Sequence, residues 1–324
     1  MRILLTGATG FLGQNLKPIL SKHYDVCGIG YRGHQPIISS RWVGGGTYGN
    51  TFDLRQQDQC QRMIKQLNPD IIVHAAGTVG GIGANKDNPG KFMYENLIMG
   101  ANLIHEAMEQ QISKFVLLGT VCAYPKHTPI PFKEEELWNG YPEETNAPYG
   151  IAKKTLMKLV EVYHEQYGMN GVNLIPVNMY GPHDHFNLTS SHVIPALILK
   201  VDQAIKEKNK SITLWGTGQA SREFLYTADC AEAIQLAIET DVSPEPMNIG
   251  TGKEIKICDL IENICDIMGY DGEILYDTTK PDGQPRRCLD TSKAQKLLGF
   301  KAKTPLKDGL IHTIKWFNET ISGV

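Results

Sequence analysis

Gly7-Ala8-Thr9-Gly10-Phe11-Leu12-Gly13, residues 7–13, has a glycine at every third position. The stretch follows an apolar run at residues 2–6 that predicts a β-strand, and it leads into a segment at 12–22 that predicts a helix. Glycines permit a tight turn and let backbone N–H groups approach a pyrophosphate at a helix N-terminus. We therefore predict a dinucleotide-binding loop with contacts from Gly7, Thr9, Gly10, Phe11, Leu12 and Gly13; the alternative is a glycine-rich turn without a ligand.

Short apolar segments and longer helical ones alternate after this loop. Further strands are predicted at 24–29, 70–75, 114–120 and 172–178, and further helices at 56–67, 92–110 and 148–167. Strands that lack polar alternation and are separated by helices indicate a parallel sheet buried on both faces. We predict an α/β fold, a Rossmann-type parallel sheet with a smaller C-terminal substrate lobe.

The pattern loosens beyond residue 180, where loops rich in Pro, Asn and Gly appear. Four helices are predicted there, at 193–207, 228–239, 256–268 and 305–319. We predict a cofactor-binding Rossmann domain over 1–180 and a substrate-binding lobe over 181–324. The two are expected to interleave, because a segment such as 222–239 can pack back on the first domain.

Composition excludes several classes of protein. The 324 residues carry 32 basic and 35 acidic side chains, a formal charge of −3 without a block of like charges, so nucleic-acid binding is not expected. No run of 18 apolar residues predicts a membrane span. Seven dispersed cysteines indicate reduced thiols and a cytoplasmic protein, and no metal site is predicted.

The end of the second predicted strand bears on cofactor choice. NAD enzymes usually place Asp or Glu there to bind the ribose 2′-OH, whereas this chain reads Gly28-Ile29-Gly30-Tyr31-Arg32. The missing acid and the following Arg32 favour the 2′-phosphate of NADP(H), the alternative being a solvated surface arginine. Asp53 and Leu54, after the next apparent strand, are expected to border the adenine.

Tyr149 and Lys153 form a Y-x-x-x-K pattern that puts both side chains on one helix face. An ammonium group beside a phenol favours the phenolate and lowers the pKa of the tyrosine. Such a tyrosine can pass a proton to or from a hydroxyl while a hydride moves at the same carbon. Thr120, at the end of the strand predicted at 114–120, can hydrogen-bond the reacting oxygen. An exposed helical pair is the alternative.

These features resemble the extended short-chain dehydrogenase/reductase family. The resemblance runs the full length and includes Asp70-x-x-x-His74-Ala75-Ala76 and Pro246-Met247-Asn248-Ile249-Gly250. It implies a parallel Rossmann sheet with a C-terminal nucleotide-sugar lobe. It also implies cofactor contacts at Ala75, Ala76, Asn96, Pro176 and Asn178, and a homodimer that pairs through helices, including the one carrying Tyr149 and Lys153.

A narrower resemblance is to the GDP-L-fucose synthases. It rests on the blocks Gly80-Gly81-Ile82-x-Ala84-Asn85, Cys122-x-Tyr124-Pro125-Lys126, Asn146-x-Pro148-Tyr149-x-Ile151-Ala152-Lys153, Tyr180-Gly181-Pro182-His183-Asp184, Ser191-His192-Val193-Ile194-Pro195-Ala196-Leu197, Arg222-Glu223-Phe224-Leu225 and Lys280-Pro281-Asp282-Gly283. Enzymes of that family invert C3 and C5 of GDP-4-keto-6-deoxy-mannose and then reduce C4 with NADPH. The resemblance thus implies a nucleotide-sugar substrate.

The same resemblance implies catalytic roles. Thr120 stands where the family has its catalytic serine, and Tyr149 and Lys153 match the reduction pair. Cys122 and His192 match the base and acid of epimerisation, and thiols and imidazoles both titrate near neutral pH. The alternatives are a buried core thiol for Cys122 and a structural loop histidine for His192.

For the nucleotide, the resemblance implies contacts from Asn178, His192, Lys200, Trp215, Arg222 and Lys280. Arg222 and Lys280 are expected to face the diphosphate, and Lys200 stands where the family usually has arginine. Trp215 is expected to stack or pack near the nucleotide, with plain core packing as the alternative.

Departures from the family pattern leave other functions open. The glycine loop has the general form rather than the one usual in fucose synthases, Thr120 replaces serine, and residues 33–52 show no match. One alternative is a C4 reductase or an epimerase alone, acting on another nucleotide-linked sugar such as a GDP-deoxyheptose. A remote alternative is a non-catalytic NADP-binding sensor.

Overall fold

A seven-stranded sheet forms the centre of the computed structural model, which describes residues 1–30, 37–38, 52–188, 190–280 and 282–323. Its strand order is β10-β6-β5-β4-β1-β2-β3, and all neighbours run parallel except β2 and β3. The strands are β1 (Arg2–Thr6), β2 (Asp25–Ile29), β3 (Ile37–Ile38), β4 (Ile71–His74), β5 (Lys114–Leu118), β6 (Gly171–Pro176) and β10 (Met247–Ile249). The predicted α/β fold with a Rossmann-type sheet is confirmed.

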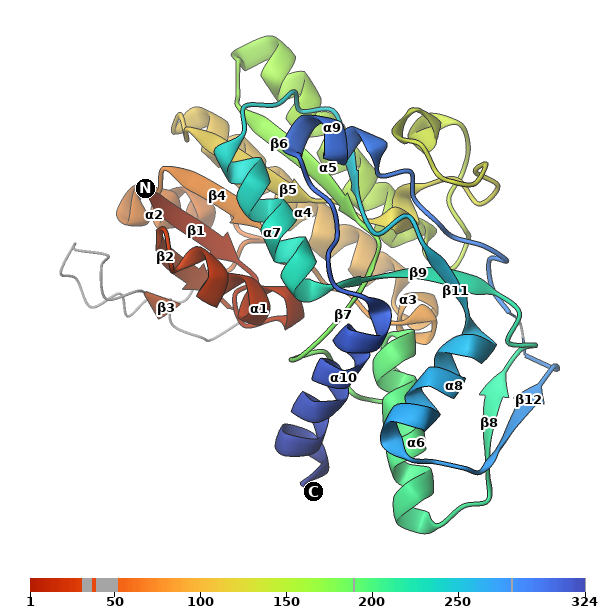
Figure 1. Ribbon diagram of the computed structural model, residues 1–324. Helices are drawn as coiled ribbons and strands as arrows, with labels where there is room; N and C mark the ends of the chain where they lie inside the picture. The colour runs from red at the N-terminus through yellow and green to blue at the C-terminus, as the bar shows by residue number, and fades with distance from the viewer. Residues whose placement is uncertain (31–36, 39–51, 189, 281, 324) are drawn as a thin grey trace.

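Helices cover both faces of this sheet (Figure 1). One layer holds α1 (Phe11–Leu20) and α7 (Thr227–Glu239), and the other holds α2 (Gln57–Leu67), α4 (Pro89–Glu109) and α5 (Ala147–Tyr167). Every residue of β4, β5 and β6 is therefore buried. Burial on both faces explains why these strands read as continuous apolar runs without polar alternation.

The second lobe has its own hydrophobic core, which includes Ile198, Leu260 and Ile314. It contains a three-stranded sheet of β7 (Asn178–Tyr180), β9 (Ser221–Tyr226) and β11 (Glu254–Lys256), and a two-stranded sheet of β8 (Ser211–Trp215) and β12 (Glu273–Asp277). Its helices are α6 (Val193–Glu207), α8 (Ile257–Met268) and α10 (Leu306–Phe317). The chain also forms two short helices, α3 (Ile82–Asp87) and α9 (Ser292–Leu298).

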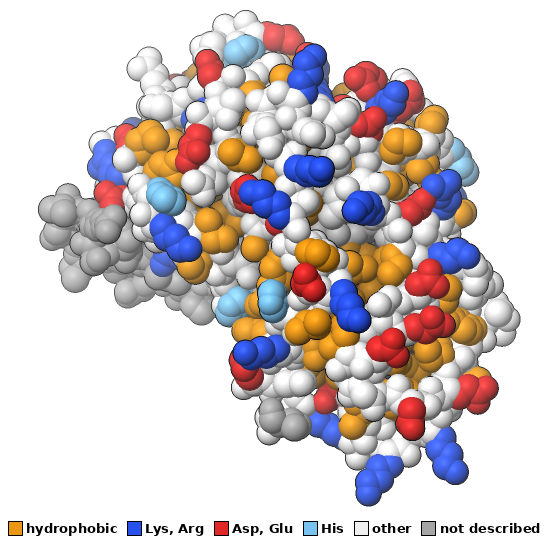
Figure 2. Space-filling view, in the orientation of Figure 1, with side chains coloured by type: hydrophobic (Ala, Val, Ile, Leu, Met, Phe, Trp, Pro, Cys, Tyr) orange, Lys and Arg blue, Asp and Glu red, His pale blue; other side chains and the backbone are white. Residues whose placement is uncertain are grey.

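Two segments beyond residue 180 lie on the first lobe. Helix α7 packs against α1, and β10 pairs in parallel with β6 at one edge of the large sheet. The division of the chain near residue 180 stays a prediction. Among the described residues, no helix is both long and apolar enough to cross a membrane. Acidic and basic side chains are interspersed over the face shown in Figure 2.

The strand predicted at 172–178 is wrong in its extent. It is two strands, because β6 ends at Pro176 and β7 begins at Asn178 in a different sheet. Proline cannot donate to a strand ladder, and the Val177 N–H bonds Ile249 O as the chain leaves the large sheet. The strand predicted at 114–120 likewise ends at Leu118, and Thr120 caps the 3-10 turn η1 (Val121–Ala123).

Candidate active site

One cavity of about 1110 Å³ runs from the glycine loop past the carboxyl ends of the central strands into the second lobe. A site for one drug-sized ligand occupies roughly 300–1,000 Å³, so this cavity has room for two ligands end to end. Predicted site residues that line it are Gly7, Thr9, Gly10, Phe11, Leu12, Gly13, Asp53, Leu54, Ala75, Ala76, Thr120, Cys122, Tyr149, Lys153, Pro176, Asn178, His192, Lys200, Trp215 and Arg222.

The glycine loop leaves no space for side chains at two of its positions. Gly7 has a φ of +74°, and a Cβ there would lie 2.8 Å from backbone atoms of Ala75 and Ala76. A Cβ on Gly13 would lie 2.1 Å from Gly7 O. The loop therefore sits directly on the chain after β4, and α1 begins at its end. This cradle of bare backbone at a helix N-terminus fits a dinucleotide pyrophosphate.

Gly7→Ala should weaken binding of NADPH, the cofactor that the sequence predicts, by about tenfold or more. The substitution forces a left-handed conformation on a residue with a Cβ, at a cost of about 1–2 kcal/mol, and adds the backbone clash. Titration of the protein against NADPH fluorescence measures the change. Gly90→Ala is the matched control, because no atom lies within 4 Å of its added Cβ. Equal affinity in the two variants would contradict the role given to the loop.

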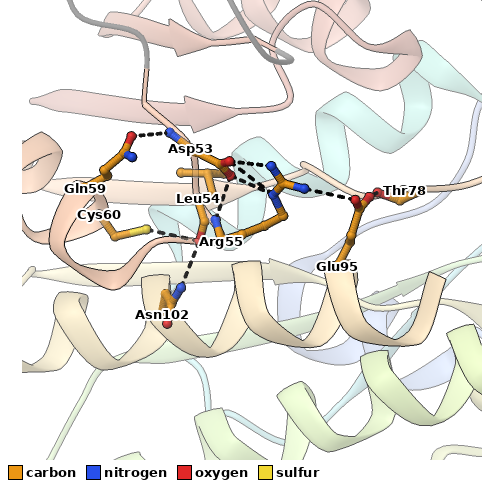
Figure 3. A network of polar contacts seen from close by, with 8 residues as sticks. All are labelled: Asp53, Leu54, Arg55, Gln59, Cys60, Thr78, Glu95 and Asn102. Atoms are coloured by element: carbon orange, nitrogen blue, oxygen red, sulfur yellow. Dashed lines mark hydrogen bonds and ion pairs between the residues drawn. The ribbon is translucent and has the colours of Figure 1, made fainter. Parts of the chain in front are cut away.

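A network of polar contacts fixes the predicted adenine border (Figure 3). The Asp53 carboxylate accepts from Arg55 Nε at 2.8 Å, and Arg55 Nη1 lies 3.1 Å from Glu95 Oε1. Leu54 O accepts from Asn102 Nδ2 at 3.0 Å. Arg55 lines the cavity but was not predicted. Arg55 pairs with both Asp53 and Glu95, and Glu95 lies on α4. These ion pairs hold the backbone of residues 53–54 in place without a ligand.

Three predicted contacts are placed differently from the rest. Arg32 lies outside the described residues. Asn96 is buried and does not line the cavity; its side chain instead accepts from Thr78 N at 3.0 Å and donates to Thr78 O at 2.9 Å. It therefore supports a lining residue rather than facing the cavity. Lys280 also lies off the lining, with Nζ 6.0 Å from the centre of the Trp215 ring.

Thr120, Tyr149 and Lys153 meet where β5 ends against α5. The Thr120 hydroxyl hydrogen-bonds the Tyr149 phenol, and Lys153 Nζ donates to Leu118 O at 3.1 Å. The packing is close, because a Cβ on Gly150 would lie 2.3 Å from Cys122 O. Helix α5 therefore carries the Tyr149/Lys153 pair directly against the turn that holds Thr120 and Cys122.

The charge state of the pair differs from the expectation. Desolvation raises the pKa of Tyr149 above its usual value, the nearby Cys122 raises it further, and only the Thr120 hydrogen bond lowers it. Burial lowers the pKa of Lys153 to about 8. The expected lowering of the tyrosine pKa by Lys153 is therefore not what this structure shows. Near neutral pH Tyr149 keeps its proton, which suits a proton donor.

Cys122 and His192 enter the same cavity from different lobes. Cys122 is half-buried in η1, and its N–H donates to Thr120 Oγ1 at 3.2 Å. His192 precedes α6 with a side chain 47% exposed, and its Nδ1 lies 3.7 Å from Oδ1 of the buried Asp184. Neither residue is enclosed in the core, so the alternative of a buried structural thiol does not describe Cys122.

The loop before His192 is docked on the first lobe. Gly81 N donates to Ser190 O at 2.9 Å, and a Cβ on Gly81 would lie 2.6 Å from Ser191 O. The sequence singled out Gly80 and Gly81 only by resemblance. The structure shows why Gly81 has no side chain: the loop of residues 190–191 packs directly on its backbone, which places His192 at the cavity.

Cationic side chains gather at the far end of the cavity. Burial and the neighbouring Arg287 lower the pKa of Arg222 to about 10, and burial lowers that of Lys200. Trp215 is 72% exposed, which excludes the core-packing alternative. The guanidinium of Arg222 and the ammonium of Lys200 beside an exposed indole suit a diphosphate and a nucleobase. Arg287 and Gln284 also line the cavity but were not predicted.

Comparison with known proteins places this site in a family. Residues 3–250 match the NAD dependent epimerase/dehydratase family. The chain belongs to that family. Two relatives in it are GDP-L-fucose synthases. The protein from Escherichia coli K12 is 40% identical, with 98% of this chain and 97% of that one covered. The protein from Sinorhizobium fredii is 39% identical, with 84% and 86% covered.

Solved structures superpose closely on the chain. A GDP-6-OMe-4-keto-L-xylo-heptose reductase from C. jejuni gives a TM-score of 0.86 at 26% identity, covering 98% of this chain and 97% of that one. A GDP-L-fucose synthetase from Naegleria fowleri bound to NADP gives a TM-score of 0.83 at 26% identity, with 98% and 94% covered.

Proposed function

We propose that this protein is an NADPH-dependent 3,5-epimerase/4-reductase of a GDP-linked 4-keto-6-deoxy sugar. The observation that carries the proposal is the single cavity, which combines Thr120, Tyr149 and Lys153 with Cys122 and His192. Relatives named GDP-L-fucose synthase at 40% and 39% identity support it. In this proposal the first lobe binds NADP(H) and the second lobe binds the nucleotide sugar.

Reduction uses the residues at the end of β5. NADPH, when bound on the glycine loop, supplies the hydride for C4 of the sugar. Tyr149 donates its proton to the C4 oxygen, and Thr120 hydrogen-bonds the same oxygen. Lys153, held by Leu118 O one helical turn from Tyr149, is mostly protonated below pH 8 and supports the proton transfer.

Epimerisation uses the two residues that enter from different lobes. The 4-keto group acidifies the protons on C3 and C5, because the electrons released on deprotonation move to the carbonyl oxygen. Cys122 removes such a proton, and His192 returns one to the opposite face of the carbon. Asp184, 3.7 Å from His192 Nδ1, orients the imidazole. Arg222 and Lys200 bind the diphosphate beside Trp215, and Lys280, whose Nζ lies 6.0 Å from the centre of the Trp215 ring, adds its charge from just outside the lining.

A C4 reductase alone is the second candidate. The GDP-heptose reductase that superposes on this chain favours it, and so does the glycine loop of the general family form. A non-catalytic sensor is disfavoured, because Thr120, Tyr149 and Lys153 are all present and line one cavity. An epimerase/reductase should exchange carbon-bound protons of the sugar with solvent, whereas a C4 reductase alone should exchange none.

Turnover with GDP-4-keto-6-deoxy-mannose tests the proposal. NADPH oxidation should follow the substrate in a one-to-one ratio, with NADH much less efficient in kcat/KM. A panel of other nucleotide-linked 4-keto sugars gives the comparison. No NADPH oxidation with any keto sugar would overturn the proposal in favour of the sensor.

The protein is proposed to be a homodimer. Helices α4 and α5 flank an apolar groove of about 510 Å³, lined by Tyr94, Leu97, Ile98, Ala101, Thr155, Leu156, Lys158, Leu159 and Val162. Tyr94, at the edge of the groove, is 62% exposed, and the family resemblance implies pairing through helices, including the one that carries Tyr149 and Lys153. A second copy of the chain is the proposed occupant.

Leu159→Lys should separate this dimer, because it places two buried charges at the symmetric interface. Light scattering at micromolar concentration should give twice the 36.0 kDa chain mass for the unmodified protein and 36.0 kDa for the variant. Ile311→Lys, at an exposed apolar position on α10, is the control and should stay dimeric. An unmodified protein of 36.0 kDa would refute the dimer.

A cytoplasmic location is part of the proposal. All seven cysteines are free in the structure, and five of them are buried in the two cores or next to them. Free thiols persist in a reducing compartment. The proposed epimerisation also needs a reduced thiol at Cys122, and a reducing compartment keeps thiols in that form.

A further inference from the structure

Arg287 approaches the sulfur of Cys122 from the second lobe. Its Nη1 lies 3.8 Å from Cys122 Sγ, although the two residues are 165 positions apart in the chain. The side chain is only 9% exposed and lines the same cavity. We propose that Arg287 is a positioning residue that orients the sulfur of Cys122 and stabilises the negative charge that the sulfur carries when it acts as a base. The inference rests on the proposed role of Cys122 as the base of epimerisation.

The guanidinium is aimed by a neighbouring amide. Arg287 Nε and Nη2 both donate to Gln284 Oε1, at 3.2 and 3.0 Å. The other end of that amide is itself anchored, because Gln284 Nε2 donates to Lys126 O at 2.9 Å. Two of the three guanidinium nitrogens are thus occupied, and the third, Nη1, is left to face the thiol.

The backbone after Arg287 is equally fixed. Phe132 N donates to Cys288 O at 2.8 Å, and Asp290 N donates to Phe132 O at 2.9 Å. Between them Leu289 N donates to the buried Glu223 carboxylate at 2.7 Å. These bonds tie the segment to β9 and to the chain that follows η1, so Arg287 cannot drift away from Cys122.

Charge balance around Arg287 favours an anion at the sulfur. No ion pair joins Arg287 to a carboxylate among the residues that the structure describes. Two cationic groups, Arg287 and Arg222, act on Cys122, and the neutral phenol of Tyr149 lies in the same cavity. Arg287 and Arg222 repel each other, which contributes to the lowered pKa of Arg222. Asp282 offsets part of the Arg222 charge, whereas the charge of Arg287 is left to act on the sulfur of Cys122, and a nearby arginine stabilises thiolates in general.

Alkylation of Cys122 by iodoacetamide tests the inference without any substrate. Only the thiolate reacts, and the modified peptide identifies Cys122 among the seven cysteines. Arg287→Gln removes the positive charge next to the sulfur and should slow alkylation at pH 7 about tenfold. Arg287→Lys, which keeps the charge, should retain most of the rate.

Arg286→Gln is the matched control. Arg286 is the preceding residue, but its side chain is 58% exposed and pairs with Glu254 instead, so the alkylation rate should not change. Gln284→Ala is a second variant if Arg287→Gln does not fold. It leaves the arginine in place but removes the acceptor that aims it, and alkylation should also slow. Unchanged alkylation rates in the Arg287 and Gln284 variants would overturn the inference.

The same variants separate this inference from its main rival, a role for Arg287 in binding the diphosphate. In that case Arg287→Gln would weaken GDP binding and leave the alkylation rate unchanged, which would overturn the inference. The proposed function fails in a different way. If the unmodified enzyme incorporates no solvent deuterium into its product, Cys122 is not an epimerisation base, whatever the alkylation rates are.

Discussion

Tyr149→Phe should lower the rate of ketone reduction by roughly 10²–10⁴, the usual cost of losing a positioned proton donor. The C4 oxygen must gain a proton as the hydride arrives, and Tyr149 is the phenol that contacts Thr120 in the cavity. Because its pKa is raised, the phenol holds its proton at neutral pH. NADPH oxidation with a saturating keto sugar measures the loss.

The control for this variant lies on the same helix. Tyr163 bonds His105 at 3.1 Å, outside the cavity, so Tyr163→Phe should keep the reduction rate. NADPH binding should be similar in both variants, because the glycine loop is untouched. A Tyr149→Phe enzyme that reduces at the unmodified rate would show that the proton comes from another group.

Cys122→Ser should stop solvent deuterium from entering C3 and C5 while leaving slow reduction of the unepimerised keto sugar. A serine hydroxyl nearly matches the shape of the thiol but is far too weak an acid to serve as the base, whereas a thiol has a pKa near 8.5 in isolation. The reaction is run in D₂O, and mass spectrometry measures how much deuterium enters the sugar. Exchange should fall by roughly 10²–10⁴.

Cys258→Ser is the matched control for exchange. Cys258 is the other cysteine that is not fully buried, but it lies on α8 beside Asp259. That variant should exchange at the unmodified rate. Normal exchange in Cys122→Ser would mean that the thiol is structural, and the chain would then be better described as a C4 reductase.

Local sequence patterns predicted the fold, because the strands, helices and glycine loop depend mainly on residues close together in the chain. The strand, glycine loop and helix at residues 2–22 need only neighbouring residues, and the apolar strands follow from burial on both faces. Strands β7, β10 and β11 have only three residues each. Segments so short show no periodicity, so their pairing depends on the tertiary structure alone.

Side-chain environments were harder to predict. The Y-x-x-x-K spacing identifies Tyr149 and Lys153, but the raised pKa of the phenol comes from desolvation, which spacing does not encode. Arg287 reaches Cys122 across 165 positions, and no local motif links them. Asn96 was predicted at the cofactor from resemblance, whereas its side-chain amide hydrogen-bonds the N–H and the carbonyl of Thr78.

The central claim is that one site both epimerises and reduces. The most direct measurement incubates the unmodified enzyme with GDP-4-keto-6-deoxy-mannose and NADPH in D₂O, and then locates deuterium in the product by NMR. The account predicts solvent deuterium on carbon at both C3 and C5, with protium from NADPH at C4. A product reduced at C4 but without deuterium at C3 and C5 would contradict it.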